Sequence, residues 1–372
     1  MRRRQCRPDP LGPARARRSE RGLTLVELLL GAGLGVLMLS AVAMVLLAAG
    51  RIQRNQHLLS DANEEGRTAL RNVARSMSAA GAGGAVYSYM SATGVQQRPA
   101  LLFTNGVKPL NAPSMPQKPD SLILLRYVAD RRTVLVGPLT SSLVSVAPDA
   151  RPPTAPGVEP TVFRDGESAL ITNFQRAMLV PISRRDLNAS LRTVDLTVTG
   201  NDPLALQDSQ IPIEPGATVF PVRVIRYRVV YVAPVGNVPE RADLVEETLD
   251  PRTLEPTQQT VLARNVEDFQ VQWAYDRNDD GVADGAGAGA YTDVGPTESL
   301  FDPQLTFARI SLSARTSDTL VSDQGEFVTQ EDSPFERGLD LAGEDSRPPP
   351  SGYRRRVLST VVLLKNLVAP RI

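Results

Sequence analysis

One carboxylate stands inside the longest apolar run of the chain. Glu27 is the single charged residue between Leu23 and Ala49. A lone carboxylate in an apolar helix costs several kcal/mol unless it is paired or protonated, so Glu27 is a candidate functional residue. The alternative is a polar residue tolerated near the membrane interface. As a helix the run would extend roughly 40 Å, more than the ~30 Å hydrocarbon core of a bilayer, which predicts a membrane-spanning segment.

A second group of oxygen-bearing residues is spaced for a hard cation. Residues 276–284 place acidic or amide side chains at the first, third, fifth and ninth positions of a loop and glycine at the sixth. Calcium loops use this pattern together with a backbone carbonyl at the seventh position. The twelfth position is Gly287 rather than glutamate, so the loop is not an EF-hand, and a plain solvated turn is the alternative interpretation. The candidate ligands are Asp276, Asn278, Asp280, Val282 and Asp284.

The chain lacks the residues that most catalytic sites require. His57 is the only histidine and Cys6 is the only cysteine. Zinc sites and Ser-His-Asp triads need several such residues to converge, and no glycine motif that cradles phosphate is present. We therefore expect no enzyme activity, no catalytic residues and no cofactor other than possible calcium.

The charge is unevenly distributed along the chain. Residues 1–22 carry eight arginines and two acids (8 − 2 = +6), so residues 23–372 carry a net charge of −6. A basic segment before an apolar run is typical of a targeting leader, and its arginines favour a cytoplasmic N-terminus. The acidic remainder argues against nucleic-acid binding, which needs a clustered basic surface.

The junction between leader and apolar run reads Arg21-Gly22-Leu23-Thr24-Leu25-Val26-Glu27. It resembles the cleavage signal of type IV prepilins and type II secretion pseudopilins. The resemblance implies that a prepilin peptidase cuts after Gly22, that Leu23 becomes the methylated N-terminal residue, and that Glu27, fifth in the processed chain, pairs with the amine of a neighbouring subunit. An ordinary secretory signal would instead be cut on the far side of the run, near Ala49.

The elements that would hold these residues follow from periodicity. Residues 23–50 are predicted to form a membrane-spanning helix, which the resemblance implies is also the filament-core helix. Apolar residues at spacings of three and four extend this helix through residues 51–83. Residues 84–372 change to short period-two runs, with loops near 147–160 and 318–352. The predicted fold class is α+β, a long N-terminal helix followed by a β-rich domain. The candidate strands are Ser121–Val128, Val134–Gly137, Ala169–Thr172, Ala177–Ile182, Thr193–Thr199, Val219–Ala233, Val266–Tyr275, Thr306–Arg315 and Arg356–Leu364.

Three stretches of the sequence resemble one group within this superfamily, the PilW-like minor pilins. They are Asn63–Leu70 with Ala74–Gly81, then Val266–Trp273, and finally Arg355–Thr360 with Leu364–Leu367. The resemblance implies a pilin-like fold and a low-abundance subunit that helps to prime pilus assembly near the tip. It also implies an inner-membrane protein with a single span, whose C-terminal domain lies outside the cytoplasm and enters the pilus.

The expected partners are the prepilin peptidase, other major and minor pilins, and the inner membrane, with no nucleic acid. Two alternatives stay open: a minor pseudopilin of a type II secretion system, and a pilus-associated binding module for adhesion or DNA uptake.

Overall fold

The computed structural model describes residues 24–82, 85–91, 93–106, 119–127, 131–148, 163–164, 167–188, 190–198, 202–206, 212–233, 241–278, 280, 282–284, 291–296, 305–316 and 355–364. The chain divides into two compact units, Met1–Arg54 and Asn55–Ile372. The predicted loop at 318–352 and most of that at 147–160 lie outside the described residues.

A single long helix, α1 (Leu25–Ala79), begins the described chain. Its first half is apolar and its large side chains are exposed, among them Leu30, Leu37 and Val45. By length and composition this helix could cross a membrane, and it is the one such helix among the described residues.

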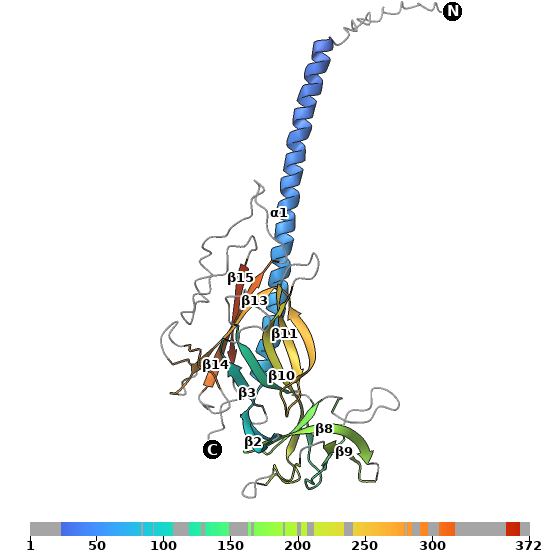
Figure 1. Ribbon diagram of the computed structural model, residues 1–372, viewed down its shortest axis with the longest axis vertical. Coiled ribbons are helices and arrows are strands. Elements are labelled where there is room, and N and C mark those ends of the chain that lie inside the picture. Colours follow the sequence, from blue (N-terminus) through green and yellow to red (C-terminus); the bar gives the residue numbers. More distant parts are fainter. Residues whose placement is uncertain are drawn as a thin grey trace, which may run out of the picture. The chain divides into compact units, whose positions relative to one another are not determined.

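The second half of α1 is amphipathic and packs into the core of the second unit. Its buried residues are Gly66, Ala69, Leu70, Val73, Ser76 and Met77, which confirms the predicted apolar stripe. This half of the helix lies against strands of the second unit (Figure 1). Gly66 brings the backbone close to a strand, because a Cβ there would lie 2.6 Å from Leu358 Cδ1.

The described residues of the second unit form two sheets. The larger has twelve strands, and its main path runs β12-β11-β10-β7-β8-β1-β2. Off this path, β4 pairs with β10 and β3, β5 pairs with β10, and β9 pairs with β8 and β6. The smaller sheet has the order β13-β14-β15. The strands are β1 (Val86–Ser91), β2 (Gly94–Pro99), β3 (Leu101–Thr104), β4 (Ser121–Tyr127), β5 (Thr133–Val134), β6 (Leu143–Val146), β7 (Ser168–Thr172), β8 (Ala177–Asn188), β9 (Thr193–Val198), β10 (Thr218–Val232), β11 (Arg241–Leu249), β12 (Pro256–Ala263), β13 (Val266–Tyr275), β14 (Leu305–Arg315) and β15 (Arg355–Leu363).

Two separate hydrophobic clusters occur among the described residues of this unit. The first joins Val73 and Met77 of α1 to residues of both sheets, including Ile225 and Trp273. The second lies among β5 to β10 and the loops between them, and it contains no residue of α1. The part of the large sheet around β7 to β9 therefore has its own core.

The strand predictions divide into two groups. Strands β4, β7, β8, β9, β10, β13, β14 and β15 begin within one residue of their predicted starts. The predicted Val134–Gly137 is instead the two-residue strand β5, and β8 ends at Asn188 rather than Ile182. Strands β1, β2, β3, β6, β11 and β12 were not predicted. The layout is the expected one, a long apolar helix followed by a strand-rich domain.

Candidate functional site

Glu27 lies in the first turn of α1 and completes a capping box. Thr24 precedes the first helical residue, and its hydroxyl accepts a hydrogen bond of 3.3 Å from Glu27 N. In return, Glu27 Oε2 accepts bonds of 3.0 Å from both Thr24 N and Thr24 Oγ1. This reciprocal arrangement satisfies backbone donors that a helix start otherwise leaves free. Glu27 therefore has a local structural partner, in addition to any pairing with another chain.

The helix surface near Glu27 is apolar. One face carries a shallow groove lined by Val26, Leu29, Leu30, Gly33, Leu34 and Leu37. Apart from the neighbouring backbone of the helix itself, no heavy atom lies within 4 Å of an added Cβ at Gly31, Gly33 or Gly35, so this stretch has room for a closely packed neighbour. The two residues of the predicted cleavage, Gly22 and Leu23, lie outside the described residues.

The predicted calcium loop follows β13 directly. Asp276 Oδ1 and Asn278 Oδ1 accept hydrogen bonds of 3.1 and 3.2 Å from Asp280 N. Asp280 Oδ1 accepts from Val282 N at 2.8 Å, and Asp284 Oδ2 accepts from Arg277 N at 2.6 Å. The side-chain oxygens thus bind backbone amides within the loop. No group of three or more His, Cys, Asp or Glu residues placed to hold a metal occurs among the described residues, so calcium binding stays a prediction.

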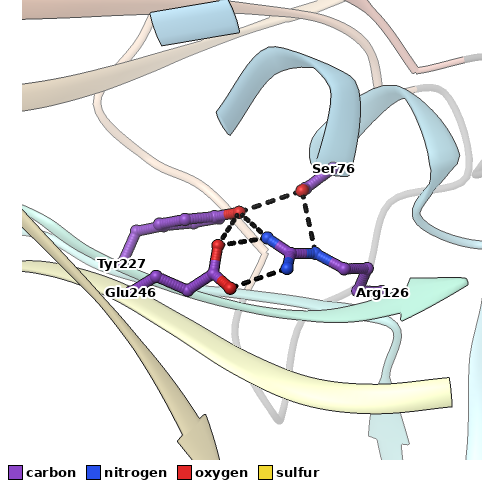
Figure 2. A network of polar contacts seen from close by, with 4 residues as sticks. All are labelled: Ser76, Arg126, Tyr227 and Glu246. Atoms are coloured by element: carbon purple, nitrogen blue, oxygen red, sulfur yellow. Dashed lines mark hydrogen bonds and ion pairs between the residues drawn. The ribbon is translucent and has the colours of Figure 1, made fainter. Parts of the chain in front are cut away.

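A polar network links α1 to three strands of the large sheet. Figure 2 shows Ser76 of α1 in contact with Arg126 of β4 and Tyr227 of β10, and both of these in contact with Glu246 of β11. Both terminal nitrogens of Arg126 donate hydrogen bonds to the Glu246 carboxylate, and Arg126 Nη1 lies 2.6 Å from Glu246 Oε1. Arg126 also donates to Tyr227 Oη at 2.6 Å and to Ser76 Oγ at 3.2 Å. Tyr227 Oη lies 2.9 Å from Ser76 Oγ and 3.1 Å from Glu246 Oε2, so its proton has two acceptors.

The protonation states of this network suit a structural role. Burial raises the pKa of Tyr227 to about 12, so its hydroxyl stays neutral. Burial alone would lower the pKa of Arg126, but the hydrogen bond to Glu246, the interactions with Tyr227 and the charge of Glu246 together outweigh it and raise that pKa. A neutral tyrosine and a fixed guanidinium do not exchange protons near neutral pH, so the network positions the helix and does not supply an acid or base.

The opposite face of β10 carries a second charged cluster. Arg226 Nε lies 2.6 Å from Glu247 Oε2, and Arg228 Nη2 lies 2.8 Å from Glu247 Oε1. Glu247 is 1% exposed. Because a buried carboxylate binds both guanidinium groups, these arginines do not form a basic stripe.

A buried aspartate joins the two sheets. Asp120, next to β4, accepts hydrogen bonds from Val271 N of β13 at 2.7 Å and from Gly106 N at 3.1 Å. Its own amide donates to Phe269 O at 2.7 Å. Burial raises the pKa of Asp120 to about 7. The two accepted hydrogen bonds oppose this increase, whereas the nearby carboxylates of Asp268 and Asp293 add to it.

Sequence reasoning missed the capping box, the four-residue network and Asp120. The first had a local signal, because Thr24 and Glu27 have the spacing of a capping box before an apolar run. The network had none, since 50 residues separate Ser76 from Arg126 and 101 separate Arg126 from Tyr227.

Comparisons with known proteins give no relative for this chain. No protein-family model, curated protein or solved structure matches it.

Proposed function

We propose that this chain is a minor type IV pilin that takes part in priming or assembly of the pilus near its tip. The observation that carries the proposal is the junction at residues 21–27, where a basic leader, Gly22 and a single acid at Glu27 meet an apolar segment. Each part has a physical role, because the arginines orient the segment and the acid offers a pairing group inside an apolar assembly.

Several described features support this proposal. The first half of α1 exposes apolar side chains over its whole length, as a helix that packs among other helices or in lipid would do. The second half is held to the large sheet by apolar packing and by the Ser76–Arg126–Tyr227–Glu246 network. A globular domain mounted in this way would be carried on the helix into an assembly.

Deletion of the gene, followed by counting of surface filaments, tests the proposal. We expect few or no filaments in the deletion strain and restoration by the intact gene. The sheared filament fraction of the restored strain should contain the protein. Normal filament numbers in the deletion strain would contradict a role in priming. Impaired protein secretion with normal filaments would instead favour a secretion pseudopilin.

A further inference from the structure

The sequence contains one asparagine–glycine step, and it lies in the bend that follows β3. Asn105 is exposed, and the φ angle of Gly106 is 63°. Residues with a Cβ rarely adopt this left-handed conformation, so glycine suits the position. Because glycine has no side chain, the Gly106 nitrogen is also open to approach by the side chain that precedes it.

An asparagine followed by glycine can lose its side-chain amide without an enzyme. The Gly106 nitrogen attacks Asn105 Cγ, so that a bond forms between these two atoms while the Cγ–Nδ2 bond breaks. Nδ2 leaves as ammonia and takes the Gly106 proton with it. Water then opens the cyclic imide at either of its carbonyls, which gives aspartate or isoaspartate at position 105. The step is favoured because both reacting atoms belong to the same short stretch of chain.

A buried carboxylate engages the nucleophile of this reaction. Gly106 N donates a hydrogen bond of 3.1 Å to Asp120 Oδ1. Asp120 is 2% exposed, and its Oδ2 accepts from Val271 N of β13 at 2.7 Å, so the acceptor is held in place. The bond fixes the orientation of the Gly106 peptide and keeps its proton on the nitrogen. Attack on Asn105 Cγ therefore requires this hydrogen bond to open first.

We propose that Asn105 is a site of spontaneous deamidation, and that the hydrogen bond between Gly106 and Asp120 suppresses the reaction while Asp120 joins the two sheets. Local opening of this junction releases the Gly106 amide, and Asn105 then converts. The reaction adds a carboxylate at an exposed position, one residue before the amide that Asp120 binds. The modification therefore records that the junction has opened.

Peptide mapping by mass spectrometry measures the conversion in the full chain, kept in detergent at mildly alkaline pH. Folded Asp120→Ala should deamidate at Asn105 about tenfold faster than the parent, because a hydrogen bond to a carboxylate is lost. Arg126→Met is the matched control, since it weakens the same unit and keeps the Gly106 hydrogen bond. It should convert at the parental rate while Trp273 fluorescence shows it to be folded. Equal rates in the parent and folded Asp120→Ala, or an equal increase in Arg126→Met, would overturn the proposal.

Two measurements on the parent chain decide the matter even if Asp120→Ala does not fold. Urea removes the hydrogen bond between Gly106 and Asp120, so the unfolded parent should deamidate at Asn105 at least about tenfold faster than the folded parent. Hydrogen exchange of the Gly106 amide should be slower in the folded chain by a similar factor. A Gly106 amide that exchanges freely in the folded chain, or equal deamidation of folded and unfolded chains, would contradict the assignment.

Discussion

Glu27 combines two separable roles in one side chain. Its carboxylate caps the start of α1 through Thr24, and this bond is local. The proposed pairing with an amine of another subunit requires charge. Glutamine serves a capping box as well as glutamate does, so the two roles can be tested independently.

We expect Glu27→Gln to insert into the membrane normally but to be lost from filaments, because the variant keeps the cap and loses the charge. Thr24→Ala is the matched control, since it weakens the cap by about 1 kcal/mol and keeps the carboxylate. The measurement is the amount of each variant in the membrane and sheared filament fractions. Normal incorporation of Glu27→Gln would show that the charge has no role in assembly.

Asp120 predicts a pH dependence of stability. Its folded-state pKa is raised from 3.8 to about 7, so the stabilisation by its protonated form is fully present below about pH 4 and is lost as the pH rises towards 7. Each unit of difference between the two pKa values corresponds to roughly 1.4 kcal/mol. Asp120→Asn should therefore flatten the pH profile of unfolding between pH 4 and 7, although it also loses one of two accepted hydrogen bonds.

Denaturant unfolding at several pH values measures this effect. Trp273 is the only tryptophan, is fully buried and lies in β13, the strand that Asp120 contacts, so its fluorescence reports on the relevant junction. Asp61→Asn, at an exposed position of α1, is the control and should leave the profile unchanged. An identical profile for Asp120→Asn and the parent would refute the assignment.

At the scale of elements, the contact between α1 and the large sheet combines apolar packing with one charged network. The Arg126 and Glu246 side chains are 31% and 16% exposed, so both are substantially desolvated. Removing one partner leaves the other charge without its main partner in a poorly hydrated site, which costs more than the pair contributes.

Arg126→Met and Glu246→Gln should each lower the free energy of unfolding by about 2 kcal/mol. The double variant should lose less than the sum, with a coupling energy of about 1 kcal/mol or more. Arg184→Met is the control, because the Arg184–Asp186 pair is 74% and 48% exposed and should contribute under about 0.5 kcal/mol. Additive effects would show that the network does not act as a unit.

The loop after β13 gives a prediction of its own. If it binds calcium, millimolar calcium should raise the melting temperature of the full chain, with a dissociation constant on the order of 10⁻⁴ to 10⁻³ M. Asp280→Asn should weaken this binding, while Asp61→Asn should not. Calorimetry without heat, together with an unchanged melting temperature, would leave the plain turn as the interpretation.

Local patterns predicted some elements and could not predict others. The strand β10 has an apolar run near its start and continues with apolar residues interspersed with Arg223, Arg226 and Arg228, so it was visible as a strand in the sequence. In β12, six consecutive residues are exposed, and polar residues such as Gln258 and Gln259 give no alternation. In β11, Asp243 and Glu247 interrupt the apolar pattern of the sequence. Both acids are nevertheless buried, because arginines of the same or the neighbouring strand bind their carboxylates.

The same distinction applies to the candidate sites. Glu27 stood out because the contrast between one charge and an apolar run is local to the sequence. Tyr227 and Asp120 did not, because their burial and partners arise only when distant strands pair. A single sequence contains no local trace of such pairing.

At the scale of the whole molecule, the chain divides into two compact units of different composition. The apolar half of α1 carries the features expected for anchoring and assembly, and the second unit has its own two hydrophobic clusters. The charges follow the same division, with the basic leader before the apolar segment and the acidic surplus after it. An anchored subunit that presents a globular domain is the arrangement that this division favours.

The most direct test of the proposed pilin identity is mass spectrometry of the N-terminus of the protein extracted from membranes. We predict a chain that begins at Leu23 and carries an N-methyl group. We also predict that the uncut chain accumulates when the prepilin peptidase is deleted. A mature chain that begins after Ala49 or Gly50, or one that keeps the leader in the presence of the peptidase, would contradict the proposed identity.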